Sequence, residues 1–222
     1  MKFTINGKRT LALTAITLFG SAQAATFTEG FESVPALSES GWLLANAGAA
    51  PTNPWFQGVG GTGGTFDAQR GTASSYVAAN YLSSATGLID NWLISPLLTI
   101  DTRGVLSFYT RSLGTPGFND RLEVYFSQGA GTSFSSFMSL GSVGTATAYP
   151  TDWTLFSFAF PNSSSGRFAF RQTGTVDTAD YLGIDTVSVS GSFAAAIPEP
   201  STYALMALGL GGLAFVARRR AA

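Results

Sequence analysis

Short runs of alternating hydrophobic and polar residues dominate the chain between residues 26 and 191. Residues 121–127 read RLEVYFS, which places Leu122, Val124 and Phe126 on one face of an extended segment and polar side chains on the other. Residues 105–111, 154–160 and 167–172 alternate in the same way. Because neighbouring side chains of a strand point to opposite faces, this pattern predicts antiparallel strands with one buried and one wet face.

The segments between these runs are rich in turn residues, and no long stretch has a helical period. Several short strands separated by such turns predict an all-β fold, a two-sheet antiparallel sandwich. Residues 112–120, with Gly114, Pro116 and Gly117, are expected to be a hairpin connection. Residues 58–64 read GVGGTGG, but no Lys-Ser/Thr follows, so this is not a phosphate loop. We expect these glycines to allow sharp turns or close backbone approach in a loop at one end of the sandwich.

The N-terminal segment has the pattern of a secretory signal peptide. Lys2, Lys8 and Arg9 precede a mostly apolar run at 11–19, and Ala22 and Ala24 form a small-x-small cleavage site. We expect residues 1–24 to engage Sec-type export machinery and to be removed after Ala24. An uncleaved N-terminal anchor is the alternative.

The C-terminal segment combines a rigid polar break, an apolar run and a basic end. Pro198, Glu199 and Pro200 precede a run without charge from Thr202 to Ala217, and Arg218, Arg219 and Arg220 follow it. The run is 16 residues long, whereas a comfortable bilayer span needs roughly 20. We expect the apolar run to insert into the membrane as a helix. The basic cluster predicts that its arginine end stays in the cytoplasm and that the rest of the chain lies on the far side.

The order of these parts, over 198–222, resembles the PEP-CTERM sorting signal of bacterial envelope proteins. The resemblance implies recognition and cleavage by an exosortase, a membrane enzyme with a cysteine nucleophile. It also implies export to the cell envelope or extracellular matrix of a Gram-negative-type bacterium, with the chain anchored only transiently in the inner membrane. A permanent single-span anchor is the alternative. Residues 192–197 are expected to link the sandwich to this signal.

Without the two terminal segments, about 166 residues remain, which suits one domain with a substantial core. Six of the 12 basic residues and one of the 13 acidic residues lie in those segments, so 6 basic and 12 acidic residues remain. The body therefore carries a net charge of about −6 and has no lysine. Such a surface repels phosphate backbones, and we expect no nucleic-acid partner.

The chain contains neither cysteine nor histidine. This excludes Ser-His-Asp and Cys-His nucleophilic sites, ordinary zinc sites and histidine general bases. Carboxylate pairs remain for catalysis, and an oxygen-ligand site, which favours calcium, remains for metal binding.

Three motifs of the body occur in a recognisable order. They are Gly30-Phe31-Glu32-Ser33 with Pro35 and Gly41-Trp42, the run DNWLISP at 90–96, and the run LGIDTVSV at 182–189. Together they resemble a choice-of-anchor J domain, which is similar to the cleaved adhesin and MAM-type jelly rolls, over roughly 27–191. The resemblance implies a jelly roll that serves at the envelope. Thr186 departs from the family pattern, which usually has a second aspartate there.

Asp185 is the most suggestive acidic residue. It shares strand parity with Val187 and Val189, so we expect it on the core side, where a carboxylate needs a partner. Calcium, held with Glu32 and backbone carbonyls, is one such partner. Related jelly rolls often tie their first and last strands together in this way. Backbone amides or an arginine are the alternative.

The middle motif is expected to start a buried strand with Trp92, Leu93 and Ile94. Pro96 lacks an N–H and should lie at a strand edge or bend. Asp90 and Asn91 are expected to cap the preceding loop. Ligand contact by Trp92 is the alternative to core packing.

The function expected from these features is a non-catalytic exported module for adhesion or matrix structure, with polysaccharide as the ligand. Aromatic residues in or near predicted loops could stack on sugars or fill the core; they are Trp42, Trp55, Phe56, Tyr76, Tyr81 and Tyr149. The alternatives are a purely structural surface protein and a glycan hydrolase. The hydrolase would use Asp120 with Glu123, or Asp152 with Asp90, as its two carboxylates.

Overall fold

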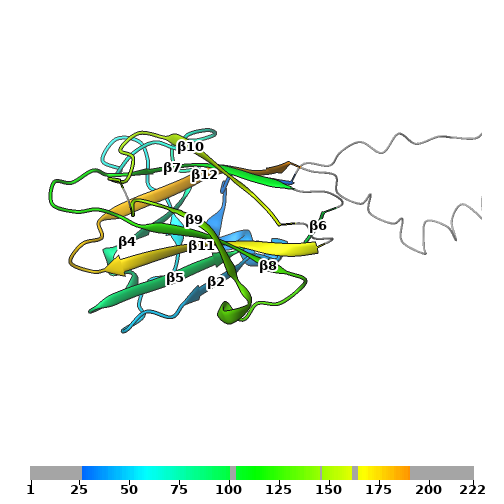
Figure 1. Ribbon diagram of the computed structural model, residues 1–222. Coiled ribbons are helices and arrows are strands. Elements are labelled where there is room, and N and C mark those ends of the chain that lie inside the picture. Colours follow the sequence, from blue (N-terminus) through cyan, green and yellow to red (C-terminus); the bar gives the residue numbers. More distant parts are fainter. Residues whose placement is uncertain (1–26, 101–103, 146, 162–164, 191–222) are drawn as a thin grey trace, which may run out of the picture.

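The computed structural model describes residues 27–100, 104–145, 147–161 and 165–190. Two antiparallel sheets lie face to face in this part of the chain, which confirms the predicted all-β sandwich (Figure 1). The first sheet has the strand order β10-β7-β12-β4-β3, with β1 paired to β12. The second has the order β2-β5-β11-β8-β9, with β6 paired to β11.

The strands of the first sheet are β1 (Phe27–Glu29), β3 (Phe56–Gln57), β4 (Val77–Asn80), β7 (Val105–Ser112), β10 (Thr154–Ala159) and β12 (Tyr181–Ser190). Those of the second sheet are β2 (Leu43–Asn46), β5 (Leu88–Ile94), β6 (Leu98–Thr99), β8 (Leu122–Gln128), β9 (Met138–Val143) and β11 (Ser165–Thr175). Three short 3-10 helices complete the description: η1 (Val34–Ser40), η2 (Tyr81–Ser83) and η3 (Phe134–Ser136).

The core lies between the sheets and is built from the alternating positions that the sequence indicates. Leu122, Val124 and Phe126 of β8 are fully buried, while Glu123 and Tyr125 between them are half-buried on the other face. Phe108 of β7 meets Phe170 of β11 across the sandwich, with ring centroids 4.7 Å apart in an edge-to-face arrangement. Such aromatic contacts add to the area that each ring buries, so they hold the two sheets together.

The segment 112–120 is not a hairpin, because β7 belongs to the first sheet and β8 to the second. Its Gly-Pro-Gly composition marks a reversal of the chain, and the same turn residues serve an arch between sheets as well as a hairpin within one. The two strands therefore share no backbone hydrogen-bond ladder, and their buried side chains belong to the same core.

The glycine-rich segment packs against the outer side of the first sheet rather than forming a loop at one end of the sandwich. A Cβ on Gly58 would lie 2.3 Å from the Tyr76 ring, and one on Gly60 would lie 2.0 Å from the Ala73 carbonyl oxygen. The expectation of close backbone approach is thus confirmed. The segment carries Phe66 onto Tyr76 and Tyr181, with ring centroids 5.0 and 5.3 Å apart.

The middle motif lies inside a strand rather than at its start. Asp90 and Asn91 belong to β5, so neither caps a loop as expected. Trp92, Leu93 and Ile94 are buried. Pro96 follows the end of β5, as its missing N–H requires.

The sandwich has two distinct ends (Figure 1). Phe27, the first described residue, pairs with Val189 near the end of β12. At the opposite end, Tyr181 pairs with Asn80 and Leu182 pairs with Ser112. The turns 81–87, 113–121 and 176–180 gather there, and we call this the distal end.

The predicted terminal segments lie outside the described residues. These are the signal peptide with Ala22 and Ala24, the linker 192–197, and the sorting tail with Pro198, Glu199, Pro200, Arg218, Arg219 and Arg220. Within the described ranges, the structure has no helix that is both long and apolar enough to cross a bilayer.

Candidate functional site

A β-bulge interrupts the pairing of β12 with β7. Asp185 pairs with Tyr109 of β7, whereas the next pair joins Ser188 to Ser107, so β12 has one extra residue. Thr186 in the bulge has φ 49°, in the left-handed region that a β-branched residue rarely adopts.

Because of the bulge, the predicted core-side orientation of Asp185 is wrong. Ile184 and Val187 both belong to the core, so the extra residue reverses the alternation between them. Asp185 therefore does not share a face with Val187. It lies on the outer side of the first sheet and is still 0% exposed, because residues 69–71 cover it.

Backbone amides hold the buried carboxylate of Asp185. Its Oδ2 accepts a hydrogen bond from the Arg70 N–H at 3.0 Å, and its Oδ1 accepts one from the Thr186 N–H. This is the alternative that the sequence left open. Burial raises the pKa of Asp185 to about 6, while these amides act in the opposite direction.

Glu32 and Asp185 line one pocket of about 340 Å³ between the start of the chain's body and the bulge. Glu29, Arg70 and Thr186 line it as well. The structure thus brings together the two predicted metal ligands. Glu29 turns back on its own segment, since its Oε1 accepts a hydrogen bond from the Phe31 N–H at 2.8 Å.

The two non-glycine residues of positive φ in the described chain both flank this pocket. Phe31 has φ 52° and follows β1, while Thr186 lies opposite in the bulge. Left-handed backbone at such residues costs of order 1–3 kcal/mol and tends to occur where a ligand or switch needs it. In the described residues, no three acidic side chains are close enough to share a metal ion. A cation in this pocket would therefore need backbone carbonyls or water besides Glu32 and Asp185.

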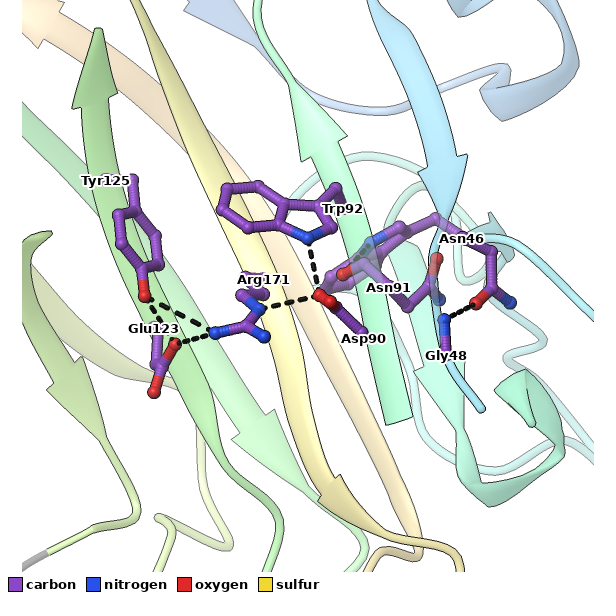
Figure 2. Close-up of polar contacts among 9 residues, drawn as sticks. Asn46, Gly48, Asp90, Asn91, Trp92, Glu123, Tyr125 and Arg171 are labelled. Carbon is purple, nitrogen blue, oxygen red and sulfur yellow. Dashed lines mark hydrogen bonds and ion pairs between the residues drawn. The ribbon is translucent and has the colours of Figure 1, made fainter. Parts of the chain in front are cut away.

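A second polar cluster crosses the outer face of the other sheet (Figure 2). Arg171 of β11 lies between Asp90 of β5 and Glu123 of β8, with N–O distances of 2.7 and 2.9 Å. Its guanidinium carbon lies 5.3 Å from the centre of the Trp92 ring, and the Trp92 indole N–H donates to Asp90. The sequence placed Glu123 and Arg171 on the wet faces of their strands. It gave no signal that they are partners, because β5, β8 and β11 are distant in sequence.

Arg171 in this cluster binds one carboxylate of each predicted catalytic pair. Glu123 is bound to Arg171, whereas Asp120 is buried at the distal end and accepts a hydrogen bond from the Asp180 N–H at 3.0 Å. Asp90 is likewise bound to Arg171, and Asp152 is exposed ahead of β10. Asp120 lines a pocket of about 180 Å³ at the distal end, but Glu123 does not line it with Asp120.

Most of the aromatic side chains considered for sugar stacking belong to the interior. Trp42, Trp55, Tyr76 and Tyr149 are buried, and Phe56 is half-buried. Tyr81 is 45% exposed at the distal end. Trp92 is buried as well, with the Phe134 ring stacked on it at 4.8 Å, which favours packing over ligand contact.

Solved structures share this architecture. The K3 cleaved adhesin domain of Lys-gingipain from Porphyromonas gingivalis W83 is similar with a TM-score of 0.60 and 20% sequence identity, over 77% of this chain and 100% of that domain. The K1 cleaved adhesin domain of the same protein gives a TM-score of 0.58 and 22% identity, over 76% and 99%. The body of the chain thus has the fold of a cleaved adhesin domain, as the resemblance implied.

The sorting tail is matched independently of the fold. Residues 196–220 match the PEP-CTERM protein-sorting motif, so the predicted signal is confirmed. No curated protein sequence matches the chain. The chain is therefore an exported, envelope-associated protein with an exosortase-type sorting motif behind an adhesin-like jelly roll.

Proposed function

We propose that this protein is a non-catalytic module of the cell envelope or extracellular matrix that acts in adhesion by associating with polysaccharide. Its sorting motif, which directly follows the sandwich, is the observation that carries the proposal. In this account Sec-type machinery exports the chain, the apolar tail anchors it transiently in the inner membrane, and an exosortase releases it from that tail. The absence of histidine and cysteine and the ion-paired state of Asp90 and Glu123 support a non-catalytic role.

A glycan array combined with a product assay tests this proposal. The exported protein should bind one or more glycans without releasing reducing sugar. Sugar release that disappears in Glu123→Gln or Asp120→Asn would instead assign a hydrolase. A blank array, together with no binding to the producing strain's own matrix, would favour a purely structural surface protein.

We further propose that the pocket between Glu32 and Asp185 holds Ca²⁺ in a structural role. The support is that Glu32 and Asp185 line the same pocket, that Asp185 is fully buried, and that the backbone is left-handed at Phe31 and Thr186. A calcium ion there would join the segment after β1 to β12, and the loss of that link would destabilise the fold. Thermal melts with calcium and with chelator test the idea, and an unchanged melting temperature would remove it.

A further inference from the structure

One side-chain contact joins the bulge of β12 to the segment that covers it. The Thr186 hydroxyl donates a hydrogen bond to the side-chain Oε1 of Gln69 at 2.7 Å, although the two residues are 117 positions apart in the chain. The contact sets a hydroxyl against the carbonyl group of a carboxamide. These groups are a nucleophile and an electrophile of acyl transfer, provided that a base activates the hydroxyl.

The carboxylate of Asp185 lies against both partners of this contact. Its oxygens accept hydrogen bonds from the backbone N–H groups of Arg70 and Thr186. The same carboxylate interacts with the Thr186 hydroxyl and with the Gln69 N–H. Asp185 is 0% exposed, so solvent does not compete for its oxygens. A carboxylate held within reach of a hydroxyl can take its proton and so activate its oxygen.

The backbone of Thr186 is strained at this contact. Its φ of 49° costs a β-branched residue of order 1–3 kcal/mol. In this conformation its N–H meets Asp185 and its hydroxyl meets Gln69. Strained backbone tends to occur where a function needs a side chain in one place, and the group so placed here is a hydroxyl.

A second contact in the protein has the same two functional groups but no base. The Ser83 hydroxyl donates to the side-chain Oε1 of Gln172 at 2.8 Å and accepts from the side-chain amide of Asn91. Among the described residues, no carboxylate forms a hydrogen bond with any of these three side chains. Asp185 is therefore what distinguishes the Thr186 contact from an ordinary hydrogen bond between a hydroxyl and an amide.

We propose that Thr186 and Gln69 become joined by an intramolecular ester. Thr186 Oγ1 attacks Gln69 Cδ, and the hydroxyl proton passes to the carboxylate of Asp185. The C–N bond of the carboxamide then breaks, and the nitrogen leaves with the bonding electron pair, takes the proton from Asp185 and departs as ammonia. One C–O bond forms and one C–N bond breaks, so the step balances without a further reactant.

The ester would fasten the segment that covers Asp185 to β12, the strand from which the chain continues to the sorting motif. The chain has no cysteine, so a disulfide cannot supply such a link. A covalent bond between residues so far apart in the chain restricts the unfolded state and thereby stabilises the fold. The inference goes beyond the proposed adhesion and is independent of the polysaccharide that is bound.

Intact mass spectrometry of the exported protein tests the proposal. The chain should weigh about 17 Da less than its sequence requires, which is the mass of the ammonia that leaves. Trypsin cleaves after Arg70 and Arg171. The linked protein should therefore give one product that joins the peptide ending at Arg70 to the peptide beginning at Gln172. Hydroxylamine, which cleaves esters, should separate these two peptides.

Variants of the two partners and of the base identify the bond. Thr186→Val and Gln69→Leu should each have the full mass of their sequences, whereas Thr186→Ser, which keeps the hydroxyl, should retain the deficit of about 17 Da. Asp185→Asn keeps the shape of the side chain without the base, and we expect it to have its full mass. Gln172→Leu is the matched control, because it removes the carboxamide of the Ser83 contact and should leave the deficit unchanged.

A wild-type chain of full mass, with Gln69 and Thr186 on separate tryptic peptides, would overturn the inference. A joined product that persists in Thr186→Val would overturn it as well. A deficit of about 17 Da in Asp185→Asn would remove that carboxylate from the reaction. Near-ultraviolet circular dichroism confirms that each variant is folded. If the mass is full and the same protein binds glycans, this inference fails while the proposed function stands.

Discussion

The side chain of Thr186 is a poor fit for the backbone conformation at its position. Its φ of 49° suits glycine, asparagine or aspartate better than a β-branched side chain. Its hydroxyl donates to the Gln69 side-chain oxygen at 2.7 Å, which links the bulge to the segment that covers Asp185. The position therefore combines backbone strain with a place beside the proposed calcium pocket.

Thr186→Asp should strengthen calcium binding. The substitution adds a carboxylate next to Asp185 and suits the left-handed backbone better. We expect calcium to raise the melting temperature of the variant by more than it raises that of the wild type. Thr186→Asn is the control, because it relieves the same strain without adding charge. Equal calcium-dependent shifts in both variants would contradict a metal at this pocket.

The pH dependence of stability should reveal the two buried carboxylates. Burial raises the pKa of Asp120 and of Asp185 from 3.8 to about 6, so the folded protein holds these protons more tightly than the unfolded chain. Their stabilising contribution is complete below pH 4 and is lost as the pH rises through 6. In chelator, we expect the free energy of unfolding to increase by about 1 kcal/mol per group between pH 7.5 and pH 5.

Urea unfolding at the two pH values measures this gain. Asp120→Asn should remove about half of it, and Asp152→Asn, at an exposed site, should leave it unchanged. A stability that does not vary between pH 5 and pH 7.5 would show that neither carboxylate is buried as described.

The sequence could identify Asp185 and Glu32 as candidates, because both lie in motifs of the resemblance. It could not orient Asp185, because an extra residue in a strand leaves no mark in the hydrophobic pattern. The parity of Val187 and Val189 pointed to the wrong face for that reason. Gln69 was missed altogether, since only the fold brings it beside the bulge.

At the scale of strands, Arg171 connects three neighbours of the second sheet. It bonds to Asp90 of β5 and Glu123 of β8 from its place on β11, and it packs against Trp92. The side chains involved are about a quarter exposed, so solvent weakens each ion pair.

Arg171→Met should lower the free energy of unfolding by about 1–2 kcal/mol, because it keeps the apolar stem and removes both ion pairs and the cation–π contact. Urea denaturation gives the value. Arg167→Met is the matched control on the same strand, since Arg167 donates to the Ser95 carbonyl and pairs with no acid among the described residues. Losses of equal size in both variants would show that the network adds nothing beyond ordinary packing.

The elements themselves could largely be read from the sequence. The alternation in 105–111, 121–127 and 167–172 corresponds to β7, β8 and β11. Which strands share a sheet could not be read, because turn residues at 112–120 fit a hairpin and an arch equally well. The glycines at 58–64 signalled close backbone approach but not the sheet face that they approach.

At the scale of the whole molecule, the two ends of the sandwich carry different features. The end with Phe27 and Ser190 leads to the sorting motif, and the distal end carries the pocket lined by Asp120 and several exposed apolar side chains. Charge, hydropathy and short motifs predict both terminal signals, since translocation and membrane insertion depend on those properties more than on fold. The match at 196–220 confirms the C-terminal one.

Replacing Pro198, Glu199 and Pro200 with alanine should hold the protein in the membrane fraction, because an exosortase reads that motif before it cleaves. Cell fractionation with immunoblotting measures the distribution. Ser192→Ala and Phe193→Ala in the preceding linker should leave it unchanged. Normal release of the triple variant would mean that the motif does not direct sorting.

The most direct test is the intact mass of the protein recovered from its own bacterium, with and without the exosortase gene. We expect the wild-type strain to yield a chain from the envelope or matrix that lacks residues 1–24 and the apolar tail. The strain without exosortase should yield a membrane-bound chain that keeps the tail. A full-length chain of 23.1 kDa in the cytosol of both strains would contradict the account.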